Sequence, residues 1–212
     1  MKLYDCATAP SPRRVRIFVA EKNLQIPVEQ VDLANRQQHS DAFAEINPHR
    51  TVPVLELDDG SRLTSTHGIQ HYLELICPQP PLIGRDAAER GKVIDLDSRI
   101  EQEGFMAVGE AFRNRSKAFA NNVFTGKHPH EQIPALVDRG HKRTQEFFDW
   151  LDDHLQHHQF VAGDCFSIAD ITAVVTLDFA RWIKRQPGTA HTHLLRWYAD
   201  VSDRPSVKNS IA

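Results

Sequence analysis

A proline within a strand-like run places the strongest constraint on this chain of 212 residues. The run Val52-Pro53-Val54-Leu55 is followed by Asp59-Gly60 and Leu63. Because proline has no N–H for a strand ladder, Pro53 predicts an edge-strand start or a bend, where a cis peptide bond is worth considering. Asp-Gly favours a tight hairpin turn, since glycine readily adopts positive φ. The run therefore predicts a two-stranded hairpin entered through a proline turn.

A helix is predicted to follow this hairpin. The apolar residues of that stretch recur at helical spacing: Ile69, Tyr72, Leu73 and Ile76. Ser65 or Thr66 precedes them as a helix cap, and the amides of such a helix start favour a carboxylate. The N–H and C=O of Val52 would remain free to pair with another extended backbone. These groups together suit a small peptide with an acidic end; the alternative is a purely structural turn and cap.

Composition and charge exclude several classes of protein. The chain is 41% hydrophobic and 25% charged with a net charge of -3, which gives no reason to expect a nucleic acid or membrane partner. The odd number of cysteines, Cys6, Cys77 and Cys165, fits a reducing compartment. Met1-Lys2 leads directly into a strand-like segment without an apolar leader, and no run of about 18 uncharged apolar residues follows. We therefore expect a soluble, cytoplasmic protein.

The first third of the chain reads as alternating strands and helices. Lys2–Tyr4 and Val28–Leu33 are predicted strands, and the helix between them is predicted to have Ser11 as its N-cap, Pro12 at its first position and its end near Lys22. A short helix is expected over residues 41–46. With the hairpin and its helix, the order is βαβ-ββα, which predicts a small sheet with a parallel first pair and an antiparallel edge pair.

Prolines then separate this unit from a helical remainder. Cys77-Pro78-Gln79-Pro80-Pro81 predicts a stiff connector, so the expected divisions are residues 1–78, a linker over 79–85, and 86–212. One long helix is expected from Asp86 to about Arg115 with a weak point at Gly104, then a loop over 116–130 and a helix over 136–157. Ser167-Ile168-Ala169-Asp170 is a capping-box pattern that opens an apolar helix, and a last helical segment ends near Val201.

In this order the motifs resemble those of the cytosolic glutathione transferases, especially the theta- and nu-like branches and bacterial members. The quoted segments are Val15-Arg16-Ile17, Phe43-x-x-Ile46-Asn47-Pro48, Val52-Pro53-Val54-Leu55, Ile69-x-x-Tyr72-Leu73 and Gly163-Asp164-x-Phe166-Ser167-Ile168-Ala169-Asp170-Ile171. Each is weak alone, but the set spans nearly the whole chain. The resemblance implies a thioredoxin-like α/β domain followed by an all-α bundle, assembled as a homodimer.

The resemblance also implies the activity. Such a protein conjugates reduced glutathione, a co-substrate, to small electrophiles through a stabilised thiolate, and serves detoxification. The alternatives are glutathione-dependent reduction of disulfides or peroxides, or a non-enzymatic binding or regulatory protein on the same fold. This chemistry requires no metal. His154, His157 and His158 have no acidic or cysteine partners in the sequence pattern, so we expect no metal site.

The candidate thiolate donor departs from the family pattern. Ala9 stands where many members have a serine, cysteine or threonine. Ser11 is therefore the first candidate, through its hydroxyl or its backbone N–H, and Thr8 is the second; the alternative for Ser11 is a pure helix cap. Tyr4 matches a buried strand position. Cys6 is either a redox thiol or a buried cysteine at a strand end, and the latter is favoured.

The resemblance assigns the glutathione-binding positions to six residues: Gln38, His39, Val52, Pro53, Ser65 and Thr66. Gln38 and His39 would reach the glycyl carboxylate. The next two are the residue whose backbone pairs with the cysteinyl part and the matching cis-proline. The last two would hold the γ-glutamyl group. Arg50 replaces a usual glycine and is either an additional cation or, as favoured, a solvated loop side chain.

The helical part offers one candidate set for the electrophile pocket: Phe105, Phe112, Arg113 and Phe119. Core packing is an equally good interpretation of these residues. Asp170 is expected to be structural, because a carboxylate at a buried helix start stabilises that start by about 1 kcal/mol. The three tryptophans, Trp150, Trp182 and Trp197, follow helical faces and are expected in the core.

Overall fold

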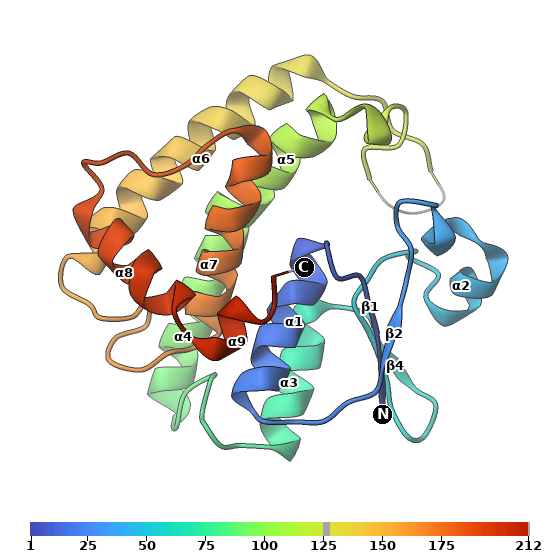
Figure 1. Ribbon diagram of the computed structural model, residues 1–212, viewed down its shortest axis with the longest axis horizontal. Helices are drawn as coiled ribbons and strands as arrows, with labels where there is room; N and C mark the ends of the chain where they lie inside the picture. Colours follow the sequence, from blue (N-terminus) through green and yellow to red (C-terminus); the bar gives the residue numbers. More distant parts are fainter. Residues whose placement is uncertain (125–127, 212) are drawn as a thin grey trace.

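The computed structural model describes residues 1–124 and 128–211, and it has a small sheet with its helices followed by a helical domain (Figure 1). The predicted βαβ unit consists of β1 (Lys2–Asp5), α1 (Pro10–Glu21) and β2 (Val28–Gln30). The ββα unit consists of β3 (Val54–Glu56), β4 (Arg62–Leu63) and α3 (Thr66–Ile76). The turn η1 (Gln37–His39) and α2 (Asp41–Ile46) connect the two units.

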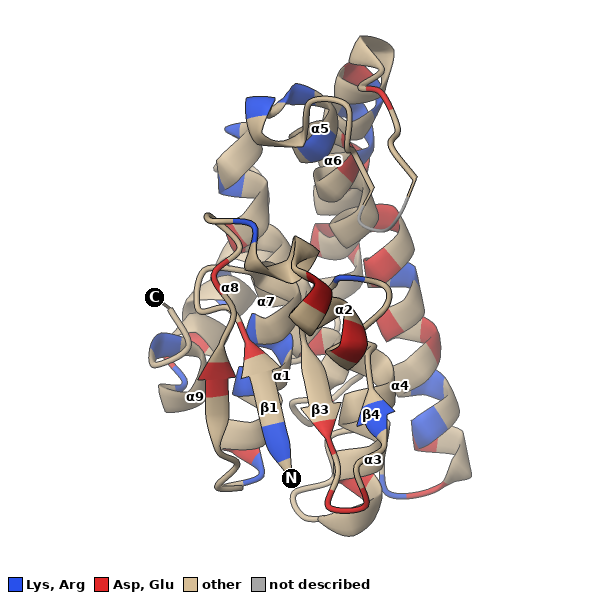
Figure 2. Cartoon of the chain, turned by 90° about the vertical axis from the view of Figure 1, so that its right-hand side faces the viewer, with Lys and Arg blue, Asp and Glu red and all other residues tan. Residues whose placement is uncertain are grey.

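The strand order is β2-β1-β3-β4, and the four strands lie side by side in Figure 2. β1 pairs parallel with β2, whereas β3 is antiparallel to both β1 and β4. Because β3 is an interior strand, the edge-strand interpretation of Pro53 is wrong and the bend is correct: Pro53 lies just before the ladder, where its missing N–H breaks no pairing. The Val52–Pro53 bond is cis, and Gly60 has the expected positive φ of 82°.

The sheet is covered on both faces, as its alternation of side chains requires. Leu3 and Leu55 join the larger core, which continues through α1 and α3 into the helical domain. On the other face, Tyr4 and Val54 pack with Phe43 of α2 in a smaller cluster that also contains Val52. The glutathione-binding turn predicted from the sequence therefore rests on its own small core.

The connector after α3 is fastened to the first domain by a buried ion pair. The Nζ of Lys22 lies 2.5 Å from a carboxylate oxygen of Glu74, and both side chains are almost fully enclosed. The other Glu74 oxygen accepts from the backbone N–H of Ile83, and Lys22 also donates to the carbonyl of Pro80. The following helix, α4 (Ala87–Arg99), begins with Asp86 as its N-cap.

The predicted long helix is continuous but changes its winding. α4 passes into a π-helical segment, η2 (Ile100–Phe105), and then into α5 (Met106–Arg115). Gly104, the predicted weak point, lies in the π segment, where an added Cβ would come within 2.8 Å of the Phe147 ring. Glycine is thus required there by the close approach of the neighbouring helix.

The remaining elements complete the helical domain: η3 (Lys117–Phe119), α6 (Pro134–Leu155), α7 (Ile168–Ala180), η4 (Arg181–Ile183), α8 (Thr192–Ser202) and α9 (Pro205–Lys208). The predicted loop over 116–130 contains the short η3, and its residues 125–127 lie outside the described part. α9 was not predicted. Trp197 is fully buried, as expected, but Trp182 is 49% exposed, so the core assignment of Trp182 is wrong.

Asp170 is structural, and it holds the start of α7, a helix that is buried on nearly all sides. Its carboxylate is fully buried and accepts from the backbone N–H of Val161, the N–H and hydroxyl of Ser167, and Nε1 of Trp197. Burial raises the pKa of this carboxyl to about 6 despite these donors. The group joins the start of α7 to α8 and to the preceding loop.

Candidate active site

The start of α1 differs from the prediction by its capping residue. Ala9, not Ser11, is the N-cap, and it provides no side-chain cap; Ser11 lies within the first turn. Pro10 and Pro12 have no amide hydrogens, and the Arg13 amide donates to the carbonyl of Ala9. The Ser11 amide is therefore the free N–H of this helix start, and among the described residues it has no acceptor. A thiolate placed here would meet this donor and the positive end of the helix dipole.

The hydroxyl of Ser11 is connected to the helical domain through Arg14. Arg14 Nη2 lies 3.4 Å from Ser11 Oγ, and Arg14 Nη1 is paired with Glu101 of η2. The guanidinium also stacks 4.2 Å from the ring centre of Phe105. The side chain is almost completely buried. Arg14 thus fixes the distance between the first turn of α1 and the π-helical segment.

The backbone of Val52 is unpaired, as the sequence predicts. Neither its N–H nor its C=O takes part in a hydrogen bond with the residues that the structure describes. Asn47 holds the adjacent turn by donating to the carbonyl and hydroxyl of Thr51 at 2.8 and 2.9 Å. An extended ligand backbone could therefore pair with Val52 without displacing a protein group.

The start of α3 leaves further donors free. Ser65 is its N-cap, and Ser65 Oγ accepts from the amide of Gly68 at 3.0 Å. Thr66 and His67 are the first two helical residues, and their amides have no acceptor among the described residues. Thr66 is buried, whereas Ser65 is exposed. This helix start suits a ligand carboxylate, although the cap itself occupies the hydroxyl of Ser65.

The predicted glycyl-carboxylate residues lie on η1, beside Arg50. Gln38 and His39 are half-buried, and Gln38 Oε1 is enclosed without a partner in the described structure. Arg50 Nη1 donates to the carbonyl of His39 at 2.9 Å, so Arg50 is anchored and half-buried, and the favoured assignment as a solvated loop side chain is wrong. Burial, with the nearby charges of Arg36 and Arg50, lowers the pKa of His39.

The alternative thiol residues occupy different surroundings. Cys6 is buried in the same small cluster as Val52, and its Sγ lies 3.5 Å from Thr8 Oγ1. Thr8 itself is exposed. Tyr4 is buried in β1, as expected, with its hydroxyl 3.4 Å from Glu56. These positions favour Cys6 as a packing residue over Cys6 as an accessible redox thiol.

Sequence reasoning missed a charged pair beside α3. His67 Nε2 lies 2.9 Å from Asp97 of α4, and the Asp97 side chain is almost fully buried. This hydrogen bond raises the pKa of His67. A histidine one residue after Thr66 was visible in the sequence, but its partner lies 30 positions away in a helix with no local signal for the pairing.

The candidate electrophile residues belong to one aromatic cluster. Phe112 packs against Phe119 and Phe179 at centroid distances of 5.4 and 5.5 Å, and Phe105 packs against Phe179 at 5.5 Å. Trp182 lies 5.2 Å from Phe112. The cluster therefore extends from the Arg14 contact to an exposed indole, so the core-packing interpretation accounts for only part of it.

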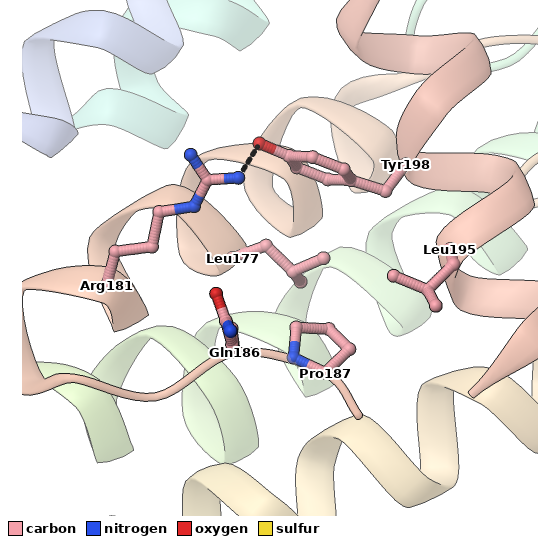
Figure 3. Close-up of a pocket in the computed structure, with 6 residues that line it drawn as sticks. All are labelled: Leu177, Arg181, Gln186, Pro187, Leu195 and Tyr198. Carbon is pink, nitrogen blue, oxygen red and sulfur yellow. Dashed lines mark hydrogen bonds between the residues drawn. The ribbon is translucent and has the colours of Figure 1, made fainter. Parts of the chain in front are cut away.

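A small pocket lies elsewhere in the helical domain (Figure 3). It is lined by residues of α7, η4, α8 and the segment after η4: Leu177, Arg181, Gln186, Pro187, Leu195 and Tyr198. Its volume of about 90 Å³ is well below that of usual ligand sites. Arg181 donates to the Tyr198 hydroxyl, which donates to Asp178, the partner of Arg13 in α1. The pocket is a gap beside a structural network rather than the predicted site.

Two further findings concern metals and membranes. Within residues 1–124 and 128–211, no group of three or more His, Cys, Asp or Glu side chains is placed to hold a metal ion. His154, one of the histidines considered, stacks on Trp150 and has Nε2 2.7 Å from the carbonyl of Val161. None of the helices described is long and apolar enough to cross a membrane.

Comparisons with known proteins match both the first part of the chain and its helical part. The glutathione S-transferase N-terminal domain matches residues 3–81, and the C-terminal domain of the same family matches residues 134–200. Glutathione S-transferase 2 of Saccharomyces cerevisiae is 31% identical over 98% of this chain and 88% of its own length.

Two solved structures extend the likeness to the fold. Gtt2 from Saccharomyces cerevisiae has a TM-score of 0.91 and 31% identity, covering all of both chains. A glutathione S-transferase domain-containing protein from Marinobacter aquaeolei has a TM-score of 0.90 and 34% identity, covering 98% of this chain and all of its own. By sequence and by structure, this chain belongs to the glutathione S-transferase family.

Proposed function

We propose that the protein binds reduced glutathione across the start of α1, the Val52 turn and the start of α3, and conjugates its thiolate to a small electrophile. One observation carries the proposal: Val52, whose backbone is unpaired, shares a small core with Ala9 at the start of α1, and the starts of α1 and α3 both retain amides without an acceptor in the described residues. The glutathione backbone would pair with Val52, the γ-glutamyl group would meet Thr66, and the glycyl carboxylate would approach Gln38 and His39.

The energetics of this arrangement suffice for thiolate formation. A thiol of pKa about 8.5 is roughly 3% ionised at pH 7, and a pKa of about 6.5 raises this fraction to roughly 75% at a cost of about 2.7 kcal/mol. A charge-assisted hydrogen bond contributes about 1.5–3 kcal/mol, and a helix start contributes up to about 2 kcal/mol. The Ser11 hydroxyl or amide and the dipole of α1 together supply this amount. This step requires no metal.

The test is titration of bound glutathione by its thiolate absorbance. We expect a pKa clearly below that of free glutathione. Ser11→Ala removes the hydroxyl and keeps the amide, so a raised pKa in this variant identifies the hydroxyl, and an unchanged pKa identifies the amide. An unshifted pKa in a complex confirmed by calorimetry contradicts the thiolate mechanism. Absence of heat at millimolar glutathione would instead support the non-enzymatic alternative.

Assembly and location complete the proposal. A homodimer is supported by apolar side chains exposed on neighbouring helices of this chain: Leu75 and Ile76 in α3, and Ile94 in α4. Light scattering coupled to gel filtration would give the mass directly. A cytoplasmic location is supported by three free cysteines.

A further inference from the structure

One face of α5 has a gap between an aromatic and a cationic side chain. Phe105, Gly109 and Arg113 are four residues apart, so they lie along one side of the helix. A Cβ added at Gly109 would meet one atom within 4 Å, Cε1 of Phe179 at 3.9 Å. The position above Gly109 is therefore open to an added group beside the edge of the Phe179 ring. We call the space bounded by Phe105, Gly109, Phe179 and Arg113 the Gly109 notch.

One end of the Gly109 notch adjoins the proposed position of the thiolate. Phe105 forms this end, and its ring lies under the guanidinium of Arg14, which reaches Ser11 Oγ at 3.4 Å. The floor continues from Phe179 to Phe112 and the exposed Trp182. A flat ring seated on this floor would stack against aromatic faces and edges, which such rings prefer.

The other end carries a cation, Arg113, that has no counter-charge among the described residues. Arg113 is half-buried, and its guanidinium makes no hydrogen bond or ion pair within the described part of the chain. The adjacent acid, Glu110, is already paired with Arg139 and Arg143 of α6. Burial alone lowers the pKa of Arg113, with no acid acting against it. A buried unpaired charge is costly, and a ligand anion would remove that cost.

The usual direction of helical side chains is the reason to place this cation at the notch. Helical side chains lean toward the N-terminus of their helix, so Arg113 leans toward Gly109 and Phe105. Eight residues at a rise of about 1.5 Å separate Arg113 from Phe105 by about 12 Å of helix. A long arginine side chain that reaches back along the helix would cover part of this distance. The remaining distance between the guanidinium and Phe105 would then be comparable to the length of a substituted aromatic ring.

We propose that Arg113 makes the electrophile site of this protein selective for flat electrophiles that carry an anionic group opposite the reacting carbon. The inference rests on the proposed function. With a chlorinated aromatic electrophile, the thiol proton of glutathione passes to solvent and the sulfur forms a bond to the ring carbon that carries chlorine. The bond between this carbon and chlorine then breaks, and chloride leaves with the bonding electrons.

A matched pair of electrophiles tests the anionic preference. 4-Chloro-3,5-dinitrobenzoate and 2-chloro-1,3-dinitrobenzene differ by one carboxylate, and each enzymatic kcat/KM is divided by the uncatalysed rate with glutathione. We expect the carboxylate compound to be favoured by about tenfold or more, as for a charge-assisted hydrogen bond. Arg113→Gln should abolish the preference, and Arg113→Lys should restore part of it.

A second variant tests the notch itself. Gly109→Ala fills the space with a methyl group in ordinary contact with Phe179 and replaces the poorest helix former except proline, so the unfolding midpoint should rise. KM for both electrophiles should rise, with glutathione affinity unchanged. The control is Gly91→Ala in α4, where an added Cβ meets nothing within 4 Å; it should raise the midpoint and leave KM unchanged.

Binding without reaction separates this inference from the proposed function. Calorimetry with 3,5-dinitrobenzoate and 1,3-dinitrobenzene, which lack the leaving group, reports on the notch even if no thiolate forms. Tighter binding of the carboxylate compound, lost in Arg113→Gln, supports the notch. Equal affinities, or a preference that survives Arg113→Gln, would overturn it.

Discussion

The starts of α1 and α7 differ in what happens to the backbone amides that have no partner within the helix. At α7, Asp170 and Ser167 bond to each other, and the Ile168 amide donates to the carbonyl of Leu82, so this start is closed and buried. At α1, Ala9 supplies no cap, two prolines remove donors, and the Ser11 amide has no acceptor among the residues that the structure describes. A closed helix start contributes stability, whereas an unfilled one retains a donor for a ligand. The start of α7, with the buried hydrogen bonds of Asp170, therefore serves the structure, whereas the start of α1 belongs to the candidate active site.

Removing the closure at α7 should have the largest effect. Asp170→Ala leaves the buried donors of Val161, Ser167 and Trp197 without an acceptor, and we expect a loss of about 3–5 kcal/mol in the free energy of unfolding. Urea denaturation measures it. Asp164→Ala, at an exposed position of the preceding loop, should change stability by less than about 0.5 kcal/mol. A loss below about 1 kcal/mol for Asp170→Ala would contradict the stabilising role given to the start of α7.

Adding a cap at α1 should make the two starts alike. Ala9 already has the extended φ and ψ of -85° and 138° that a capping residue adopts. Ala9→Asp and Ala9→Asn should each stabilise the protein by about 1 kcal/mol, because the new side chain accepts from the Ser11 amide. Both should raise the pKa of bound glutathione, and Ala9→Asp more so through its charge.

Thiolate absorbance and thermal unfolding measure the two effects of the Ala9 variants together. Stabilised variants with an unchanged thiolate pKa would show that the Ser11 amide is not the donor. The Gly91→Ala variant provides a control for stabilisation at a distant helix.

The start of α3 is intermediate between the other two, because Ser65 caps it while the amides of Thr66 and His67 have no acceptor among the described residues. The pH dependence of stability at this helix start should be the smallest of the predicted effects. The bond to Asp97 raises the pKa of His67 above its ordinary value of about 6.5. The pair of protonated His67 and Asp97 therefore contributes fully to the stability of the fold below about pH 6.5. This contribution to stability is lost as the pH rises through the pKa of His67 in the folded protein. His67→Gln should lower stability more at pH 6 than at pH 8 in paired denaturation curves. His71→Gln, exposed one turn later, should show no such difference; equal losses at both pH values for His67→Gln would contradict the pairing.

Local patterns predicted much of the fold because they act over a few residues. The proline before Val54, the hairpin glycine and the helix over 41–46 each follow from the chemistry of one or two side chains. The cap of α1 was predicted wrongly because Pro10 and Pro12 are both acceptable in a first helical turn, so Ser11 had no unique position. The exact divisions between the domains remain predictions.

The candidate site was predictable only where the backbone itself acts. Val52 and the start of α3 were found because a proline turn and a helix N-terminus have fixed chemistry. The half-buried state of Arg50, the exposure of Trp182 and the pairing of His67 with Asp97 depend on segments distant in sequence. No local pattern carries that information.

The sequence by itself determined the order of strands and helices, the turn at Pro53 and the capping role of Asp170, since each depends on neighbours within a few positions. The tertiary structure alone decided that Arg14 links Ser11 to Phe105 and that the Arg113 charge has no acidic partner in the described chain. These are distances between helices, and they are set by how the two domains pack.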